Sequence, residues 1–266
     1  MKPWRDLAAI PMPTRILMLR KDARGYPIPF AVGNGADGQP DFRVIDPSKW
    51  VRAAQHRLCG VCGEPMGART AFVGGPLSIA NRLFTDLPMH RDCAVYALRA
   101  CPFLAAPKFA YSRTAPEWAH VSQNVDAKRP NRFGLGVTKD YKLARLSDGE
   151  VVIQAAEFSA VEWWHEGEAV AGQRLEQLRM QEAREAYDVA ALKVYPGPRA
   201  TDMRRGGGWR PGKRLHWYIG FHRQLNATEG GPVKCHELPT FSTALLAEAY
   251  LKSVQSPNPE GVCHGE

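Results

Sequence analysis

Two closely spaced residue pairs, one of two cysteines and one of a histidine and a cysteine, carry the clearest chemistry in this 266-residue chain. Cys59 and Cys62 are separated by two residues, and His90 and Cys93 repeat that spacing further along. Thiolates and imidazoles are the donors that zinc prefers in closed tetrahedral sites. The pattern therefore predicts a structural Zn²⁺ held by three thiolates and one imidazole, with no coordination position left for water. The alternative is a set of buried thiols in a small core.

The remaining cysteines fit this site less well. Cys101 follows Cys93 by eight residues on a predicted helix, which places it about 12 Å further along the axis, whereas a Zn–S bond is about 2.3 Å. We expect Cys101 to be a buried apolar side chain. Adjacent residues of a strand face opposite sides, so two further pairs would not chelate one ion easily, and their role stays open: Cys235 with His236, and Cys263 with His264.

The elements around the four residues are predicted to bring them together. Asp46 and Pro47 are a strong helix start, because Asp caps free N–H groups and Pro fits the first helical position. A helix over residues 47–57 then leads into Cys59, and its expected inward face comprises Trp50, Val51 and Ala54. A second helix starts at the His90 pair and stops at Pro102. A knuckle, an intervening hairpin and a helix carrying two ligands are the order of a treble-clef zinc finger.

The rest of the chain predicts an α+β protein: a small treble-clef-like zinc module embedded in a mixed domain, with a C-terminal β-hairpin plus helix region. Three segments follow: residues 1–107 (hairpin, helix and zinc module), 108–195 (basic connection, β-hairpin and acidic amphipathic helix) and 196–266 (basic Gly-rich arm, β-hairpin and helix). We expect a hairpin over 15–33, surface connection over 108–136, strands at 136–138, 141–146 and 151–154, a short helix from 161, a helix over 173–193, strands at 215–223 and 233–238, and a helix over 242–254.

The formal net charge of +8 is spread unevenly. Residues 108–145 hold eight basic against three acidic side chains, residues 146–195 reverse to four against ten, and residues 196–225 return to seven against one. Lys and Arg bind phosphates and Trp stacks on bases, so these segments predict contact with DNA or RNA. Solvated loops are the alternative. The predicted nucleic-acid-binding residues are Lys128, Arg129, Arg132, Arg204, Arg205, Trp209, Arg210, Lys213 and Arg214.

The first 107 residues contain several runs that together resemble a family of uncharacterised bacterial and phage-borne proteins. The resemblance covers about residues 15–107, in the runs 25–30, 40–44, 59–67, 71–76, 81–82, 88–94 and 101–104; residues 162–164 with Gly167 are similar to a further piece. It implies the four zinc ligands and a phage or mobile-element setting, and it supplies no activity. Cys101 and Pro102 belong to the pattern, which leaves the role of Cys101 open. The C-terminal third has no such likeness.

Several function classes lack their motifs. His-Asn-His nucleases resemble one another in histidines placed on the hairpin, but no histidine lies between Cys62 and His90. The glycines at 206–208 lack the Lys-Ser/Thr ending of a phosphate-binding loop, and no G-x-S-x-G elbow occurs. We name no catalytic residue and expect a nucleic-acid-binding accessory protein. A protein-interaction adaptor anchored by tryptophans is the alternative, and a zinc-dependent nuclease is the third hypothesis.

The compartment is predicted from what the sequence does not contain. Its apolar share of 44% suits a folded chain, yet no apolar run reaches the roughly 18 residues of a membrane span. The first residues lack the apolar stretch and cleavage site of a signal peptide. We therefore expect a cytoplasmic protein without membrane contact, where reduced cysteines favour metal binding over disulfides. The oligomeric state does not follow from the sequence.

Overall fold

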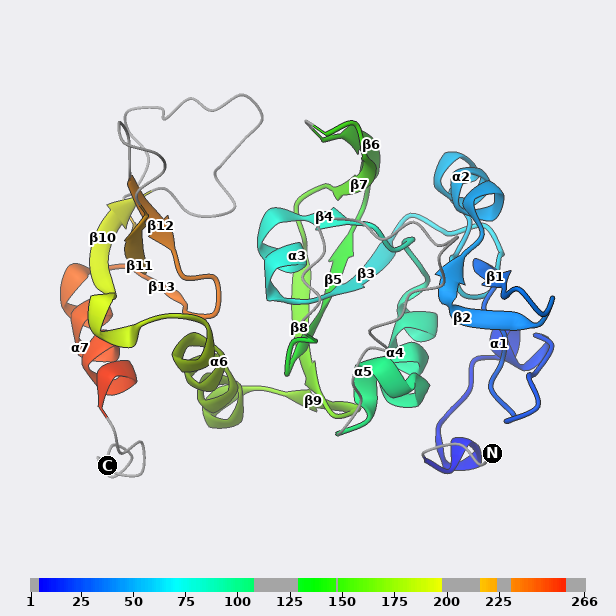
Figure 1. The fold of residues 1–266 in the computed structure, drawn as a ribbon, viewed down its shortest axis with the longest axis horizontal. Helices are drawn as coiled ribbons and strands as arrows, with labels where there is room; N and C mark the ends of the chain where they lie inside the picture. The colour runs from blue at the N-terminus through cyan, green and yellow to red at the C-terminus, as the bar shows by residue number, and fades with distance from the viewer. Residues whose placement is uncertain (1–4, 108–128, 147, 198–215, 224–230, 257–266) are drawn as a thin grey trace. The chain divides into compact units, whose positions relative to one another are not determined.

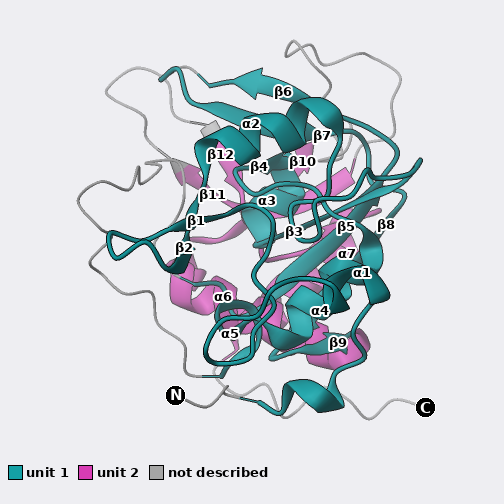
Figure 2. Cartoon of the chain, turned by 90° about the vertical axis from the view of Figure 1, so that its right-hand side faces the viewer, with its two compact units in different colours: residues 1–170 teal, residues 171–266 magenta. Residues whose placement is uncertain are grey.

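The computed structural model describes residues 5–107, 129–146, 148–197, 216–223 and 231–256. It divides the chain into two units, unit 1 over residues 1–170 and unit 2 over residues 171–266 (Figures 1 and 2). The division differs from the boundaries drawn after residues 107 and 195. Strands β5 (Phe133–Thr138) and β8 (Ala160–His165) share one sheet with β3 (Thr70–Gly74), so pairing ties this later segment to the predicted zinc module.

The described residues of unit 1 form short helices and three antiparallel sheets. Its other elements are the 3₁₀ helix η1 (Leu7–Ala9), α1 (Thr14–Leu17), β1 (Val32–Asn34), β2 (Pro40–Ile45), α2 (Pro47–His56), α3 (Pro76–Asn81), β4 (Leu83–Phe84), α4 (Arg91–Ala100), α5 (Pro102–Ala105), β6 (Tyr141–Arg145), β7 (Val151–Ala155) and β9 (Glu168–Val170). The sheets have the orders β1-β2, β3-β5-β8-β9 and β4-β7-β6. Helices beside antiparallel sheets agree with the predicted α+β class.

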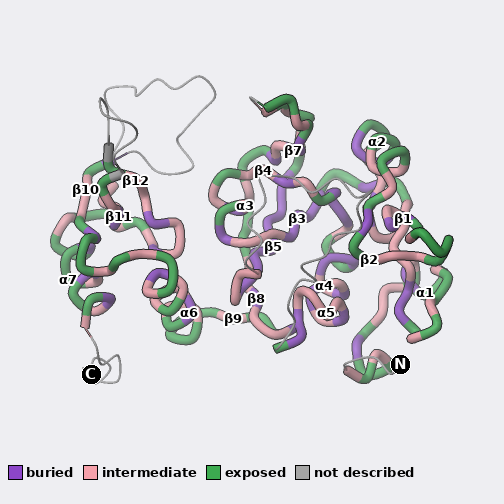
Figure 3. The backbone as a smooth tube through the Cα atoms, in the orientation of Figure 1, coloured by how far each residue is buried: buried purple, intermediate pink, exposed green. Residues whose placement is uncertain are grey.

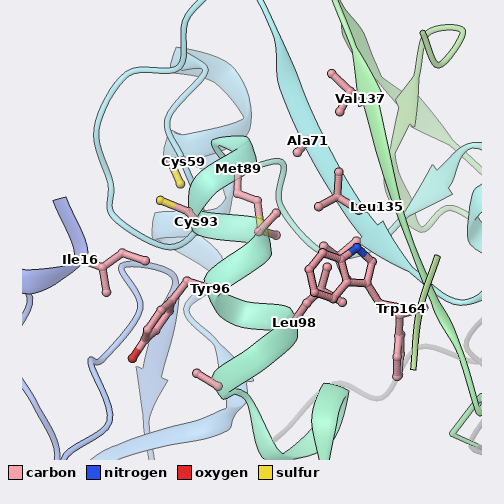
Figure 4. Packing of buried hydrophobic residues seen from close by; sticks show 14 of the residues in the cluster. Ile16, Cys59, Ala71, Met89, Cys93, Tyr96, Leu98, Leu135, Val137 and Trp164 are labelled. Atoms are coloured by element: carbon pink, nitrogen blue, oxygen red, sulfur yellow. The ribbon is translucent and has the colours of Figure 1, made fainter. Parts of the chain in front are cut away.

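The sheet β3-β5-β8 lies between two clusters of buried side chains. Ala71, Leu135 and Trp164 belong to the first cluster, which packs on α4 (Figure 4). Phe72 faces the other way, into a second cluster with Ala53 and Ala54 of α2 and with residues of α3, β4 and β7. All six residues of β5 are buried (Figure 3). The sheet therefore forms the centre of unit 1.

Unit 2 has a hydrophobic core of its own. It comprises α6 (Gly172–Ala186), η2 (Val189–Ala191), β10 (Lys193–Gly197), β11 (His216–Arg223), β12 (Gly231–Lys234), β13 (Thr240–Phe241) and α7 (Ala244–Gln255). Strand β11 pairs with β10, β12 and β13. Ala183 of α6, Ile219 of β11 and Val254 of α7 are fully buried in one cluster. The predicted C-terminal hairpin and helix are thus parts of this unit.

The predicted helix that leads to Cys59 is confirmed. The Asp46 carboxylate accepts hydrogen bonds from the backbone N–H groups of Ser48 and Lys49, and Pro47 occupies the first turn. The helix ends at His56, because Arg57 adopts a left-handed conformation with φ of 54°. Its inward face was predicted partly wrongly: Ala54 is buried as expected, but Val51 is 45% exposed and Ala53 is buried instead.

Strand β8 corrects one prediction and explains the correction. Residues 161–164 were expected to begin a helix, but they pair with β5, where Trp163 lies opposite Gly134. A side chain on Gly134 would come within 2.4 Å of the Ile79 side chain of α3 and within 3.3 Å of the Trp163 ring. The glycine therefore leaves space for both Ile79 and the indole against this strand. This pairing also makes residues 133–136 a central strand and not surface connection.

Other elements differ from prediction because local hydrogen bonds decide them. Residues 16–19 are no strand, since α1 forms through bonds from Ile16 and Leu17 to the Pro13 carbonyl. Helix α6 stops at Ala186, before the expected residue 193, and Asp188 caps the short η2 turn. Arg184, in the last turn of α6, donates to the carbonyls of Val254 and Ser256 at the end of α7. The last helix was expected from residue 242, but α7 begins at Ala244, because the Thr243 hydroxyl caps it by accepting a hydrogen bond from the Leu246 N–H.

The centre of unit 1 gives a first prediction. Leu135→Ala, at a fully buried position of β5, should lower the free energy of unfolding by about 2–5 kcal/mol, because it leaves a cavity in a packed core. Chemical denaturation followed by tryptophan fluorescence measures it. Leu77→Ala in α3, where the leucine is 44% exposed, is the control and should change stability by only about 0.5 kcal/mol. Equal effects of both variants would contradict the described core.

Candidate metal centre

The four predicted ligands lie together in the folded chain. The Sγ atoms of Cys59, Cys62 and Cys93 and a ring nitrogen of His90 are all within 4.8 Å of one another. His90 Nδ1 is 3.4 Å from Cys62 Sγ and 4.0 Å from Cys93 Sγ. Tetrahedral bonds of about 2.3 Å to sulfur and about 2.0 Å to nitrogen separate two such ligands by about 3.6 Å. The donor spacing therefore suits one tetrahedral ion.

The first ligand pair sits on a tight turn, the knuckle over residues 57–66. The Gly63 N–H donates to the Cys59 carbonyl at 2.8 Å, and the Cys59 N–H donates to the Glu64 carbonyl at 2.8 Å. The Cys62 N–H points at Cys59 Sγ, 3.5 Å away. Gly63 has φ of 76°, and a side chain there would lie 2.8 Å from the Phe30 ring. Glycine is thus required twice over, by the backbone and by the neighbouring ring.

The second pair reaches the knuckle through strand β3 and helix α4. Ala71 and Met89 exchange two backbone hydrogen bonds, of 2.8 and 2.9 Å, which hold the residue before His90 against the sheet. His90 is the N-cap residue of α4, and Cys93 lies in its first turn. The Gly60 N–H donates to the Pro88 carbonyl at 3.0 Å and joins the two halves directly. The predicted hairpin between the halves is replaced by β3, α3 and β4, whose strands pair elsewhere.

The hydrogen bond of His90 selects the nitrogen that faces the thiols. Its Nε2 lies 3.2 Å from the Pro65 carbonyl, which can only accept, so Nε2 carries the proton. The lone pair then resides on Nδ1, the atom nearest to Cys62 Sγ. Histidines that bind metals commonly donate their other N–H to a carbonyl, because the bond fixes the ring and its tautomer. The imidazole is therefore already oriented as a ligand.

The thiols are too close together to ionise independently. A hydrogen bond from Cys93 lowers the pKa of Cys59 to about 5. The same bond, with burial, raises the pKa of Cys93, and burial raises the pKa of Cys62 to about 11. At neutral pH one thiolate would thus form easily and two would not. A bound cation removes this conflict, because it ionises coordinating thiols outright.

Two of the sulfurs are part of the hydrophobic core. Cys59 and Cys93 are fully buried and belong to the hydrophobic cluster around α4, where they lie at the start of this helix on the side that faces away from the sheet (Figure 4). Cys62 and His90 are partly exposed at the edge of this cluster. Beside the site, Arg15 Nε lies 3.5 Å from the Asp92 carboxylate and links α1 to the first turn of α4. The centre therefore joins the knuckle, α1 and α4 to one core.

The other cysteines and histidines of the described residues stand apart from this cluster. Cys101 ends α4 and precedes Pro102, and burial raises the pKa of its thiol. Cys235 is buried in unit 2 and donates to a Glu237 carboxylate oxygen at 3.4 Å. Burial lowers the pKa of His236 beside it. No second group of metal-binding side chains occurs among the described residues, and Cys263 and His264 lie outside them.

Most of the predicted nucleic-acid-binding residues fall outside the described part of the chain: Lys128, Arg204, Arg205, Trp209, Arg210, Lys213 and Arg214. The structure does place Arg129 and Arg132. Arg132 is 1% exposed, with its guanidinium 4.2 Å from the centre of the Trp163 ring. Arg129 donates to the carbonyls of Phe103 and Leu104 at the end of α5. Both arginines pack inside unit 1, so we leave them out of the proposed binding surface.

The adaptor alternative would use Trp163, Trp164, Trp209 and Trp217 as anchors, and some of these side chains are already packed within the fold. Trp164 is 4% exposed and packs in the first cluster, and Trp163 lies under Arg132. Trp217 is partly buried in β11, and Trp209 lies outside the described residues.

Two contributions to the metal centre were not predicted from the sequence, the Pro65 carbonyl and the Arg15–Asp92 pair. Pro65, three residues after Cys62, was visible in the sequence, but a backbone carbonyl as hydrogen-bond partner cannot be predicted from residue types.

The knuckle gives a second prediction. Gly63→Ala should weaken zinc binding by about tenfold, because a left-handed alanine costs about 1–2 kcal/mol and its methyl group meets the Phe30 ring. Competition with a chromophoric chelator measures the affinity. Gly38→Ala is the matched control: its φ of 73° is similar, but it lies in open space in another turn, so zinc affinity should not change. An unchanged affinity of Gly63→Ala would contradict the described knuckle.

Comparison with known proteins adds no independent assignment. Models of protein families, curated proteins and solved structures all gave no match to this chain. Among the described helices, none is both long enough and apolar enough to cross a membrane. The positions of the four donor atoms therefore provide the main evidence for what this part of the chain does.

Proposed function

We propose that Cys59, Cys62, His90 and Cys93 bind one Zn²⁺ and that this ion stabilises the fold of unit 1. The proposal depends on one observation, the approach of four soft donor atoms to within 4.8 Å of one another. Three sulfurs and one nitrogen in tetrahedral spacing favour zinc over calcium or magnesium, which take oxygen ligands. Four protein ligands complete the coordination, so the role is structural and no activated water is expected.

A treble-clef arrangement is the finer form of this proposal. Its support is the order of a knuckle with two cysteines and a helix N-terminus with two further ligands. The segment between them contains helix α3, which an intervening hairpin alone would not have. We therefore propose a treble-clef-like module whose middle segment contributes β3 and β4 to two sheets of unit 1.

For the whole chain we propose a nucleic-acid-binding accessory protein in which the zinc centre holds the scaffold. The support is the charge pattern: residues 196–225 carry seven basic and one acidic side chain, and Trp209 lies among them. Counterions released from phosphates by Lys and Arg would drive binding, and the indole would stack on a base. A cytoplasmic location and a phage or mobile-element setting, the latter implied by the resemblance of residues 15–107, remain parts of this proposal.

The zinc proposal predicts a fixed stoichiometry. The purified chain should contain about one Zn²⁺, and Cys93→Ser should lose it together with at least about 4 kcal/mol of the stability of unit 1. Inductively coupled plasma mass spectrometry and chemical denaturation measure the two effects. Cys101→Ser, which changes a thiol outside the cluster, should keep the ion. Zinc bound equally well by both variants would contradict the ligand set.

If the basic segment binds nucleic acid, removing its positive charges should weaken that binding without affecting zinc binding. Neutralising Arg204, Arg205, Arg210 and Arg214 to Ala should weaken binding to DNA or RNA and reduce the slope of log K against log salt by about 3–4, while zinc content stays unchanged. Fluorescence anisotropy at several salt concentrations measures both quantities. The matched control neutralises four exposed cations of unit 1: Arg20, Lys21, Arg52 and Arg69.

Three outcomes decide between the candidate functions. If the arginine variant loses more nucleic-acid affinity than the control, the basic Gly-rich stretch of residues 199–214, which holds the four substituted arginines, is supported as the binding segment. Equal losses indicate nonspecific attraction to net charge and contradict it. An absence of binding even at low salt rejects nucleic acid as the partner, and the adaptor hypothesis, with a protein partner, then takes its place.

A further inference from the structure

The three thiols of the metal centre differ sharply in their access to solvent. Cys59 and Cys93 are fully buried in the core cluster, whereas Cys62 lies at its edge and is partly exposed, as is His90. Cys62 therefore presents one sulfur to solvent while two further sulfurs lie within 4.8 Å behind it. Redox-sensitive cysteines combine an accessible sulfur with a second cysteine that can react with it, and a bound zinc ion would keep the Cys62 sulfur in its thiolate form.

We propose that the metal centre is an oxidation-sensitive switch, in which a peroxide oxidises Cys62 and the site releases zinc. This inference rests on the proposed zinc function. Burial protects Cys59 and Cys93 from direct attack, so Cys62 reacts first. Because the other two sulfurs lie so near, either buried thiolate then completes a disulfide with Cys62 without unfolding of the chain beforehand.

The chemistry balances with hydrogen peroxide as the oxidant. The Cys62 thiolate attacks one peroxide oxygen, the O–O bond breaks, hydroxide leaves, and a sulfenic acid forms. The thiolate of Cys59 or Cys93 then attacks the Cys62 sulfur, an S–S bond forms, and a second hydroxide leaves. Two thiolates have lost one electron each, and one peroxide has become two hydroxides. A single thiolate and His90 remain as ligands, which are too few to retain the ion.

Release of the ion should loosen a defined part of unit 1. The knuckle holds residues 30 and 31 through bonds from Phe30 to the Val61 carbonyl and from Ala31 to the Gly60 carbonyl, of 2.8 and 3.1 Å. Among the residues that the structure describes, the backbone hydrogen bond between the knuckle and the segment that leads into α4 is the one from Gly60 to the Pro88 carbonyl. Without the ion, the knuckle and the first turn of α4 lose the metal–ligand bonds that would join them. Unit 2 has its own core, so its amide protection should persist.

The experiment treats the full, zinc-loaded chain with hydrogen peroxide and follows three readouts. A chromophoric chelator records released zinc, peptide mass spectrometry maps disulfides, and hydrogen exchange compares residues 57–66 and 90–94 with unit 2. We expect loss of about one Zn²⁺ per chain, a disulfide that includes Cys62, faster exchange at both segments, and reversal by dithiothreitol with added zinc.

Cys62→His is the decisive variant, because it keeps four ligands and removes the exposed thiol. Peroxide should release its zinc about tenfold more slowly, since only buried thiols remain. Cys101→Ser, the matched control, should respond like the wild type. Two results with the wild-type chain overturn the switch: zinc retained under peroxide, or a disulfide that leaves Cys62 reduced. Neither result depends on whether Cys62→His folds. A chain that binds no zinc before oxidation overturns the proposed function as well.

Discussion

Three thiols and an imidazole confined within 4.8 Å are the constraint on which unit 1 depends. The thiols cannot all ionise beside one another without a cation, as the opposed pKa shifts of Cys59 and Cys62 indicate. A bound Zn²⁺ would turn this repulsion into four bonds, two of them to sulfurs that are already side chains of the core around α4. Metal binding and folding of this unit are therefore expected to be one equilibrium.

The surrounding structure holds the ligands by backbone more than by side chains. Arg57 and Gly63, both with positive φ, shape the knuckle, and the paired amides of Ala71 and Met89 deliver the helix that bears the other ligands. The Pro65 carbonyl fixes the tautomer of His90. The charge that motivates nucleic-acid binding lies elsewhere in the sequence, since residues 59–107 hold four basic and three acidic side chains. On this account the metal supports a scaffold and takes no part in contact with a nucleic acid.

Local patterns were predictable from sequence and long-range pairing was not. The paired spacing of Cys59, Cys62, His90 and Cys93 identified the cluster, and Asp46-Pro47 located the start of α2, because ligand spacing and capping act within a few residues. The short helix predicted at Trp163 was wrong, since only its pairing opposite Gly134 makes this segment a strand. The prediction that Arg132 is a surface charge was wrong for the same reason. Its side chain is buried against Trp163, and this contact depends on the pairing of β5 with β8. The division into units followed from sheet contacts that no local signal encodes.

X-ray absorption at the zinc edge of the purified full chain tests the central claim most directly, because it reports the ligand atoms themselves. We expect a first coordination shell of three sulfurs at about 2.3 Å and one nitrogen at about 2.0 Å, with no oxygen ligand. A first shell containing water or carboxylate oxygen, or one with fewer than three sulfurs, would contradict a closed structural site at Cys59, Cys62, His90 and Cys93.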